Sequence, residues 1–385
     1  MIKTVLLGQG MVADHLAVGI ERIKMGELEP YGIPLANKNL KYSIEDIEIV
    51  GSYDVNVEKI GRTIYDVAER ELESRINIPL KLKDIEVLRG LHLGSLRGLK
   101  VNAEGLEEKK SLREAINELV DQWRKMKPDV IINVITTEYG EPFRDLKLLE
   151  NAVKKEDAER LTASQVYAYA LSKYSEETGR RAAFINVIPT PLANDEAIVK
   201  LYEKKKLIIL GDDGATGATP LTSDLLEHLA ERNRKVEFII QFNIGGNMDF
   251  LALTIPKKNL MKEATKSSIV KDVLGYDTPH YIKPTGFLKP LGDRKFVSLH
   301  MEYRTFNNLK DEIYVNLRMN DSPALAGNLV DLIRLAKIAL DKHACGTIYP
   351  INAFFMKKPG PKGSKSISKI IAYQKLLEWI ETMRD

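Results

Sequence analysis

The sequence of 385 residues contains little cysteine, little tryptophan and no long apolar run. Its single cysteine, Cys345, excludes an intramolecular disulfide framework and fits a reducing cytoplasm, where we expect the protein to be located. No apolar run is long enough to span a bilayer and no stretch resembles a signal peptide, so we expect no membrane partner. The net charge of +3 is small for this length and predicts no nucleic-acid partner.

What the sequence does contain, in its first part, is an alternation of short strands with helices. The strand patterns are mostly apolar and lie at 3–7, 47–55, 128–137, 182–189 and 207–213. The helical patterns between them lie at 11–23, 111–126, 157–179 and 194–205. Strands that are apolar on both faces and alternate with helices predict an α/β fold with a Rossmann-like, doubly wound parallel sheet.

The pattern changes after about residue 235. Longer strands, partly alternating apolar and polar, are expected at 236–244, 295–306 and 311–319, with one clear helix at 258–274. A long helix then follows, with Ser322 as its expected N-cap and Pro323 at its first position. We therefore expect a Rossmann domain over 1–219, an inserted α+β domain for catalysis and oligomerisation over 220–321, and a return to the Rossmann domain over 322–385.

The stretch GQGMVA at 8–13 matches the dinucleotide-binding pattern G-x-G-x-x-G/A between a strand and a helix. Gly8 allows a tight turn, Gly10 lets a pyrophosphate approach the backbone, and Ala13 permits close packing of the helix on the strand. The alternative is a plain glycine turn, but the strand–turn–helix context favours dinucleotide binding.

Asp54 ends the second strand and is the expected partner of the adenosine ribose. The ribose-binding acid usually follows the glycines by about 20 residues, whereas Asp54 comes more than twice as far along the chain. We attribute the difference to a loop inserted before the second strand. An acid here without an adjacent arginine favours NAD over NADP.

The stretch GDDGATGATP at 211–220 places Asp212 and Asp213 at the end of an apolar strand. A small-residue turn follows, and Thr219 and Pro220 are expected to open a helix. Such a turn makes an anion site, because free amide groups and the positive end of the helix dipole face a ligand. Two acids would repel a phosphate, so cations should stand between the acids and the ligand.

Several later motifs carry amide, acidic and ammonium groups. Asn243, Asn247 and Asp249 surround a glycine pair in QFNIGGNMDF. By itself this stretch is as typical of a hairpin turn or bulge as of a site where the backbone approaches a ligand closely. Lys262 and Lys266 in KEATK share one helix face, where like charges oppose the helix slightly. Taken alone, these lysines and the later ones in LGDRK and FFMKKPG are more typical of solvated surface side chains.

Taken together, these motifs resemble the inositol-3-phosphate synthase (myo-inositol-1-phosphate synthase) family in its shorter archaeal form. The resemblance covers nearly the whole chain, and its segments are GIERIK, GELEPYGIPLA, GDD followed by TGAT, NIGGNMDF, the KxxxK helix, GDRK, DSPALAG and KKP. It implies conversion of D-glucose 6-phosphate into 1D-myo-inositol 3-phosphate by C5 oxidation, enolisation, intramolecular aldol closure and re-reduction. NAD would be regenerated in each turnover.

The resemblance also implies a set of site residues. The catalytic residues would be Asp213, Asn243, Asp249, Lys262, Lys266, Lys295, Asp321 and Lys357, with Lys358 as an alternative to Lys357. The cofactor-binding residues would be Gly8, Gly10, Met11, Val12, Ala13, Asp54 and Thr136, and the phosphate-binding residues Thr216, Gly217 and Lys266. Lys262 and Lys295 are expected at the enolate and carbonyl oxygens, because such charge needs cations nearby.

The resemblance further implies a homotetramer built largely through the sheet of the inserted domain, and an activating cation of unknown identity. The main alternative is an NAD(P)-dependent dehydrogenase of the homoserine or semialdehyde type. A semialdehyde dehydrogenase needs a nucleophilic cysteine, and Cys345 is instead expected to be a small buried residue. A nucleotide-sensing regulator is a third reading, disfavoured because no helix-turn-helix or broad basic face is visible.

Overall fold

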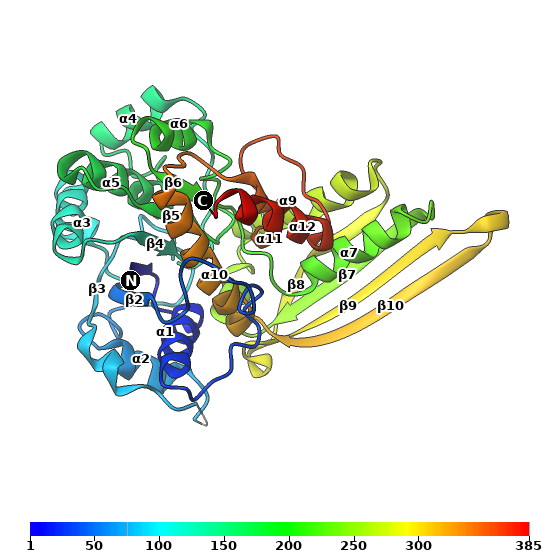
Figure 1. Ribbon diagram of the computed structural model, residues 1–385, viewed down its shortest axis with the longest axis horizontal. Helices are drawn as coiled ribbons and strands as arrows, with labels where there is room; N and C mark the ends of the chain where they lie inside the picture. The colour runs from blue at the N-terminus through cyan, green and yellow to red at the C-terminus, as the bar shows by residue number, and fades with distance from the viewer. Residues whose placement is uncertain (75, 385) are drawn as a thin grey trace.

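The computed structural model describes residues 1–74 and 76–384, and describes residues 264, 266 and 267 by their backbone alone. Figure 1 shows a sheet enclosed by helices at one end of the molecule and a second sheet that extends away from it. The long hairpin formed by strands β9 and β10 reaches farthest from the first sheet.

The first sheet is parallel, as the sequence predicts, with strand order β3-β2-β1-β4-β5-β6. Its strands are β1 (Ile2–Leu7), β2 (Ile47–Asp54), β3 (Val87–Arg89), β4 (Val130–Asn133), β5 (Ala183–Asn186) and β6 (Ile208–Leu210). This is the Rossmann-like doubly wound arrangement. The predicted strands at 128–137 and 207–213 end earlier, at Asn133 and Leu210, because the residues that follow turn away from the sheet edge.

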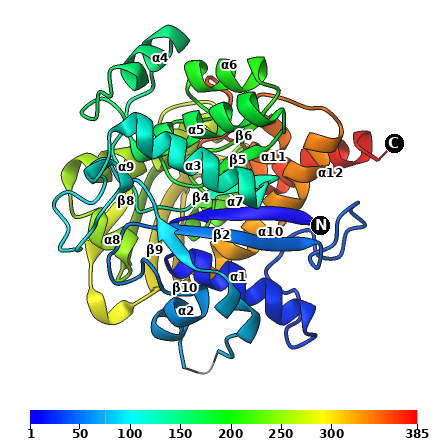
Figure 2. The ribbon, with the colours of Figure 1, turned by 90° about the vertical axis from the view of Figure 1, so that its left-hand side faces the viewer.

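Helices cover both faces of this sheet, as Figure 2 shows for α3 and α5 on one face and α1 and α10 on the other. The helices are α1 (Met11–Lys24), α2 (Ile64–Glu71), α3 (Leu112–Met126), α4 (Leu146–Lys154), α5 (Ala163–Thr178), α6 (Glu196–Lys204), α10 (Ser322–Asp341), α11 (Tyr349–Phe355) and α12 (Lys369–Thr382). Ile2 and Leu6 of β1 belong to one hydrophobic core, and Val5 and Leu7 belong to the other. Successive side chains of a strand point to opposite faces, so both faces of the sheet are buried.

The second sheet is mixed, with order β10-β9-β7-β8 and only the β7–β8 pair parallel. Its strands and helices are α7 (Ala218–Ala230), β7 (Lys235–Gly245), α8 (Met248–Ala252), α9 (Pro256–Leu274), β8 (His280–Phe287), β9 (Arg294–Arg304) and β10 (Lys310–Asn320). A third core joins α7 and α9 to one face of this sheet. Both sheets lie at the chain positions expected for two domains, and the boundaries at 219/220 and 321/322 stay a prediction.

Helices α5 and α7 begin at positions other than those predicted, because the residues before them form different caps. Helix α5 begins at Ala163 and not near residue 157, because the Thr162 hydroxyl accepts a bond from the Gln165 amide. Helix α7 begins at Ala218, one residue before the expected Thr219, after Gly217 in a left-handed conformation with φ +69°.

The start of α10 also differs from the prediction. Ser322 is the first helical residue and not the N-cap, which is Asp321. The Ser322 hydroxyl donates to Asp293 Oδ1 at 2.7 Å, so it does not cap its own helix. Within the described part of the chain, no helix combines the length and apolar character needed to cross a membrane.

Candidate active site

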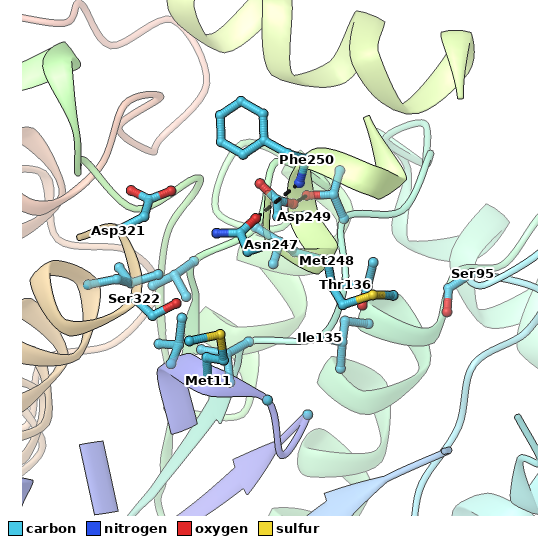
Figure 3. A pocket seen from close by; sticks show the side chains of 18 of the residues that line it. Met11, Ser95, Ile135, Thr136, Asn247, Met248, Asp249, Phe250, Asp321 and Ser322 are labelled. Carbon is cyan, nitrogen blue, oxygen red and sulfur yellow. Dashed lines mark hydrogen bonds between the residues drawn. The ribbon is translucent and has the colours of Figure 1, made fainter. Parts of the chain in front are cut away.

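A cavity of about 540 Å³ lies between the carboxyl ends of the parallel strands and the second sheet. Figure 3 shows part of its lining, from Met11 at the start of α1 to Asp321 and Ser322 at the start of α10. The expected site residues that line it are Gly8, Gly10, Met11, Val12, Asp54, Thr136, Asp213, Thr216, Asn243, Asp249, Lys262, Lys295, Asp321 and Lys357. The structure thus brings the glycine motif and the lysine motifs into one cavity.

The glycine turn, residues 8–10, connects β1 to α1 at one end of the cavity. Gly8 has φ +95°, and a Cβ there would lie 2.9 Å from the backbone of Val134 and Ile135. A Cβ on Gly10 would meet no protein atom within 4 Å, so the space beside Gly10 is open to a ligand. Gly10 caps α1 without a side-chain hydrogen bond, which leaves the first amides of the helix for an anion. Ala13 is buried behind the turn.

Asp54 lies beside the glycine turn, but its carboxylate already accepts three backbone hydrogen bonds. Oδ2 accepts from the Gln9 amide at 2.9 Å, and Oδ1 accepts from the amides of Val55 and Asn56 at 2.7 and 2.8 Å. Burial raises the pKa of Asp54, while Lys59 and these amides oppose that rise. Its bond to Gln9 ties β2 to the turn, which is a positional role in addition to any contact with a ribose.

The adjacent carboxylates Asp212 and Asp213 point in different directions, because Asp213 has a left-handed backbone with φ +61°. Asp212 accepts bonds from the side chains of Asn186 and Asn194 and from the amides of residues 192–194. Burial raises its pKa to about 6. Asp212 therefore stabilises a loop outside the cavity, and only Asp213 faces the lysines.

Asp213 is completely buried and is the centre of the lysine cluster, which we define as Lys262, Lys295 and Lys357 with Asp213 and Asp321. Its Oδ1 accepts from Lys262 Nζ at 3.0 Å and from Lys357 Nζ at 3.1 Å. Its Oδ2 accepts from the Thr265 hydroxyl at 2.6 Å. Burial alone would raise the pKa of Asp213, but the two ammonium groups hold it well below its usual range.

The two lysines that share Asp213 differ in their own acidity. For Lys262, burial is outweighed by Asp213 and Asp249, and its pKa is raised. For Lys357, burial together with the charges of Lys262 and Lys295 lowers the pKa. Lys262 is thus held charged, and Lys357 releases its proton more readily.

Lys295 and Asp321 form the second ion pair of the cluster, with Nζ to Oδ1 at 2.5 Å. The Thr216 hydroxyl donates to the same oxygen at 3.2 Å. Burial alone would raise the pKa of Asp321, but Lys295, with smaller effects of Lys357 and Lys262, lowers it to about 2. A Cβ on Gly217 would collide with the Lys295 side chain, so glycine is needed for this approach.

Asp249 and Asn243 bound the cluster on the side of the second sheet. Asp249 Oδ2 lies 3.5 Å from Lys262 Nζ, and its Oδ1 accepts from the Thr137 hydroxyl at 2.6 Å. The stretch that contains them is a strand followed by α8, and not a hairpin turn. The pairing of this strand with β8 shifts register between Asn243 and Ile244, as at a bulge. Figure 3 shows Asp249 and Phe250 with the Asn247 side chain, which caps α8 by accepting from the Phe250 amide.

The structure distinguishes Lys357 from Lys358 and leaves the Lys266 side chain undescribed. Lys357 is buried against Asp213, while Lys358 is partly exposed and contributes its backbone carbonyl to Asp212 and Asn194, so Lys357 is the one in the cluster. The side chain of Lys266 lies outside the described residues. Its place in the sequence of α9 is known, and its contact with phosphate stays a prediction.

Several residues that line the cavity or contact its side chains were not predicted from the sequence. Thr265 lies in the KEATK motif, three residues after Lys262 and therefore on the same helix face. This spacing could have predicted that Thr265 contacts the same site as Lys262. Lys59 and Asn56 come from the loop after β2, and Asp293 binds Ser322 and Asn247 across the sheet junction. Nothing local marks Lys59, because its partner Gln9 is distant in the chain. Asn56 bonds within its own loop, and Asp293 lies within the GDRK segment.

Cys345 is exposed, so the expectation that it is buried was wrong. It lies in the turn after α10, where the neighbouring Gly346 pairs with Ile208 and faces inward, which leaves Cys345 facing outward. Among the described residues, no group of three or more histidine, cysteine, aspartate or glutamate side chains is arranged to hold a metal ion.

A Rossmann-like sheet whose glycine turn shares a cavity with buried lysine–carboxylate pairs defines an α/β enzyme with an attached mixed sheet. Comparison with known proteins identifies the family. Residues 217–322 match the family model described as "Myo-inositol-1-phosphate synthase". A myo-inositol-1-phosphate synthase-related protein of Thermotoga maritima is 54% identical, with a TM-score of 0.93 over 99% of this chain and 98% of that one. The chain belongs to the myo-inositol-1-phosphate synthase family.

More distant relatives extend over most of the chain. The inositol-3-phosphate synthase of Corynebacterium glutamicum is 27% identical over 372 residues, which cover 93% of each protein. The inositol-3-phosphate synthase of Caenorhabditis elegans has the same fold, with a TM-score of 0.82 at 16% identity over 99% of this chain and 85% of that one.

Proposed function

We propose that the protein converts D-glucose 6-phosphate into 1D-myo-inositol 3-phosphate with NAD that is regenerated in each turnover. Family membership supports the reaction. The observation that carries the proposal is the single cavity in which the glycine turn meets Lys262, Lys295 and Lys357. An isomerisation that passes through a ketone and an enolate needs a redox cofactor and several fixed cations within reach of one substrate.

The residues around the glycine turn fit NAD. Gly10 leaves open space at the start of α1, whose first amides are free of side-chain caps and can bind a pyrophosphate. Asp54 stands at the end of β2, where an acid favours the ribose of NAD over that of NADP. Bound NAD supplies reversible hydride transfer at C5 of the sugar, and the remaining chemistry belongs to the protein.

The lysine cluster supplies the electrostatic and proton-transfer parts of the mechanism. We assign Lys262 and Lys295 to the enolate and carbonyl oxygens, since each is anchored to a carboxylate and oriented into the cavity. Lys357 is the group best suited to hold or give up a proton, because burial and its cationic neighbours lower its pKa. Asp213 and Asp321 keep the lysines in position.

The phosphate site is assigned to the turn before α7. The Thr216 hydroxyl, the glycine at 217 and the amides at the start of α7 lie next to Lys295, and Ala218 and Thr219 line the cavity. A helix N-terminus with an adjacent ammonium favours a phosphate dianion. Lys266 would add a second cation from α9.

We also propose a homotetramer assembled through the open face of the second sheet. This face carries the exposed aromatic side chains Phe242, Tyr281 and Tyr314, and Tyr314 stacks on His300 with ring centroids 4.1 Å apart. A contiguous set of exposed aromatics is typical of protein interfaces. The cytoplasmic location and the activating cation stay predictions from the sequence.

Product analysis tests the proposal. Glucose 6-phosphate should be consumed even when the concentration of NAD is far below that of glucose 6-phosphate. The product should be an inositol monophosphate with the same mass as the substrate. A homoserine or semialdehyde dehydrogenase would accumulate NADH in proportion to substrate, and that result would overturn the proposal. The semialdehyde form also needs a cysteine at the site, whereas Cys345 does not line the cavity.

A further inference from the structure

Behind the glycine turn lies a buried polar cluster that the roles above do not use. Its centre is Gln9, which is completely buried. Gln9 Nε2 donates to Asp14 Oδ1 at 2.5 Å, and its Oε1 accepts from the Ser52 hydroxyl at 2.6 Å. Its amide donates to Asp54 Oδ2 at 2.9 Å. One residue of the turn is therefore fixed by side chains from both α1 and β2.

The remaining backbone group of Gln9 is held by Lys59. Lys59 Nζ donates to the Gln9 carbonyl at 2.6 Å and forms an ion pair with Glu71 at the end of α2. Its side chain is 14% exposed, and both Lys59 and Glu71 line the cavity. Lys59 thus contacts the turn from the cavity side, within the region where a dinucleotide phosphate would approach.

The carboxylates near the glycine turn would repel an anionic ligand. Asp54 and Glu71 lie near the turn, and carboxylates near a phosphate repel it strongly where burial limits screening. Burial and the nearby Glu71 raise the pKa of Asp14 well above its usual range, so Asp14 carries its charge less readily. Burial opposes the charge of Lys59, but Asp54 and Glu71 outweigh it and raise its pKa, so the ammonium stays charged. Lys59 is the cation that offsets the charges of Asp54 and Glu71.

We propose that Lys59 is a positioning residue for the diphosphate of the dinucleotide, because it fixes the Gln9 carbonyl and neutralises the carboxylates behind the glycine turn. The inference rests on the proposed binding of NAD and adds a residue that the glycine motif does not contain. It predicts that the effect of Lys59 depends on how many phosphates the ligand carries.

The experiment measures the affinity of the full-length protein for NAD, ADP and adenosine by calorimetry, with weak ligands measured by competition against NAD. The variants are Lys59→Gln, which keeps a hydrogen-bond donor but loses the charge, and Lys59→Arg, which keeps the charge. Lys24→Gln is the matched control. Lys24 also bonds a carbonyl and a glutamate, at Ile47 and Glu21, and its side chain is 17% exposed, but it does not line the cavity.

Lys59→Gln should weaken NAD and ADP by roughly 10- to 100-fold, as expected for loss of a charged hydrogen-bonding group, and leave adenosine within about 2-fold. Lys59→Arg should recover most of the loss, and Lys24→Gln should bind all three ligands normally. Equal losses for ADP and adenosine, or equal losses in the Lys24 control, would overturn the inference. If Lys59→Gln does not fold, weak ADP binding by a folded Lys59→Arg would also overturn it.

The outcome for the wild-type protein separates this inference from the proposed function. If the wild type binds neither NAD nor ADP, the proposed cofactor is wrong and the inference falls with it. If the wild type binds NAD and Lys59→Gln binds it equally well, only the inference fails.

Discussion

Lys262 and Lys357 approach the same oxygen of Asp213 from α9 and from the segment after α11, and their pKa values are shifted in opposite directions. A shared carboxylate thus holds one lysine as a fixed cation beside another that exchanges its proton more easily. Such a pair combines charge stabilisation with proton transfer in one place.

Replacing Lys262 should affect both activity and stability. From the sequence alone, removing a like-charge pair from α9 would slightly stabilise the helix. The structure reverses that expectation, because Lys262 compensates a buried carboxylate. Lys262→Met should lower turnover by about 10²–10³-fold and lower the melting temperature. Asp213 keeps Lys357 as its remaining ammonium partner in this variant, so the protein should still fold. Normal turnover in Lys262→Met would remove this lysine from the site.

Alanine at the two glycines of the turn should separate folding from cofactor binding. Gly8→Ala should destabilise the protein, because the residue has φ +95° and its Cβ would clash with backbone. Gly10→Ala should keep the wild-type melting temperature, since its Cβ meets no protein atom, and should bind NAD more weakly because the methyl group occupies ligand space. Thermal unfolding without ligand and NAD titration test both. Unimpaired NAD binding by Gly10→Ala would contradict the assigned cofactor position.

Acid should weaken the fold through Asp321. Its pKa is lowered from the ordinary value of 3.8 to about 2 by Lys295, against the effect of burial. A carboxyl with a lowered pKa in the folded state stabilises the protein above its unfolded pKa and loses that contribution as pH falls through the folded pKa. The free energy of unfolding should therefore decline between about pH 4 and pH 2, and less steeply in Asp321→Asn. Equal slopes for both proteins would show that the pair contributes nothing in this range.

Lys369 should produce a dependence of the same sign in a second window at higher pH. Its buried ammonium donates to the carbonyls of Ala353 and Met356 at 2.5 and 2.7 Å, and burial lowers its pKa to about 7. The unfolded chain then binds more protons than the folded one between pH 7 and the ordinary lysine value of 10.5, so stability rises with pH in that window. Denaturant unfolding from pH 7 to pH 10 should show this rise in the wild type. Lys369→Met should show a flatter profile, and an identical profile would refute the assignment.

The parallel sheet was predictable because its strands are buried on both faces and read as continuous apolar runs. Strand β3 was not predicted, since it has only three residues, and β8 was not predicted because it contains Pro284. Proline is tolerated there because β8 is an edge strand, whose free side needs no partner for the missing N–H group. Helix α8 is a single short turn, too brief to show a period.

The site was predictable where a motif is local and not where it depends on distant contacts. The glycine turn and the position of Asp213 after a strand follow from neighbouring residues. The opposite orientations of Asp212 and Asp213 do not, because they arise from a left-handed residue and from amides contributed by residues 192–194. Lys59 gave no signal either, since its partner Gln9 lies 50 residues earlier.

The bond between Lys357 and Asp213 joins residues that are 144 positions apart. During synthesis the earlier parts of a chain emerge and begin to fold first. Lys357, one of the two ammonium groups that contact Asp213, is added only after the ribosome has synthesised α10 and α11. A chain that stops before Lys357 carries an internal charge with only part of its compensation, and Lys357→Met in the complete chain would reproduce that state. We therefore expect a polypeptide that ends before Lys357 to be less stable, and more readily cleaved by proteases, than one in which both ammonium groups contact Asp213.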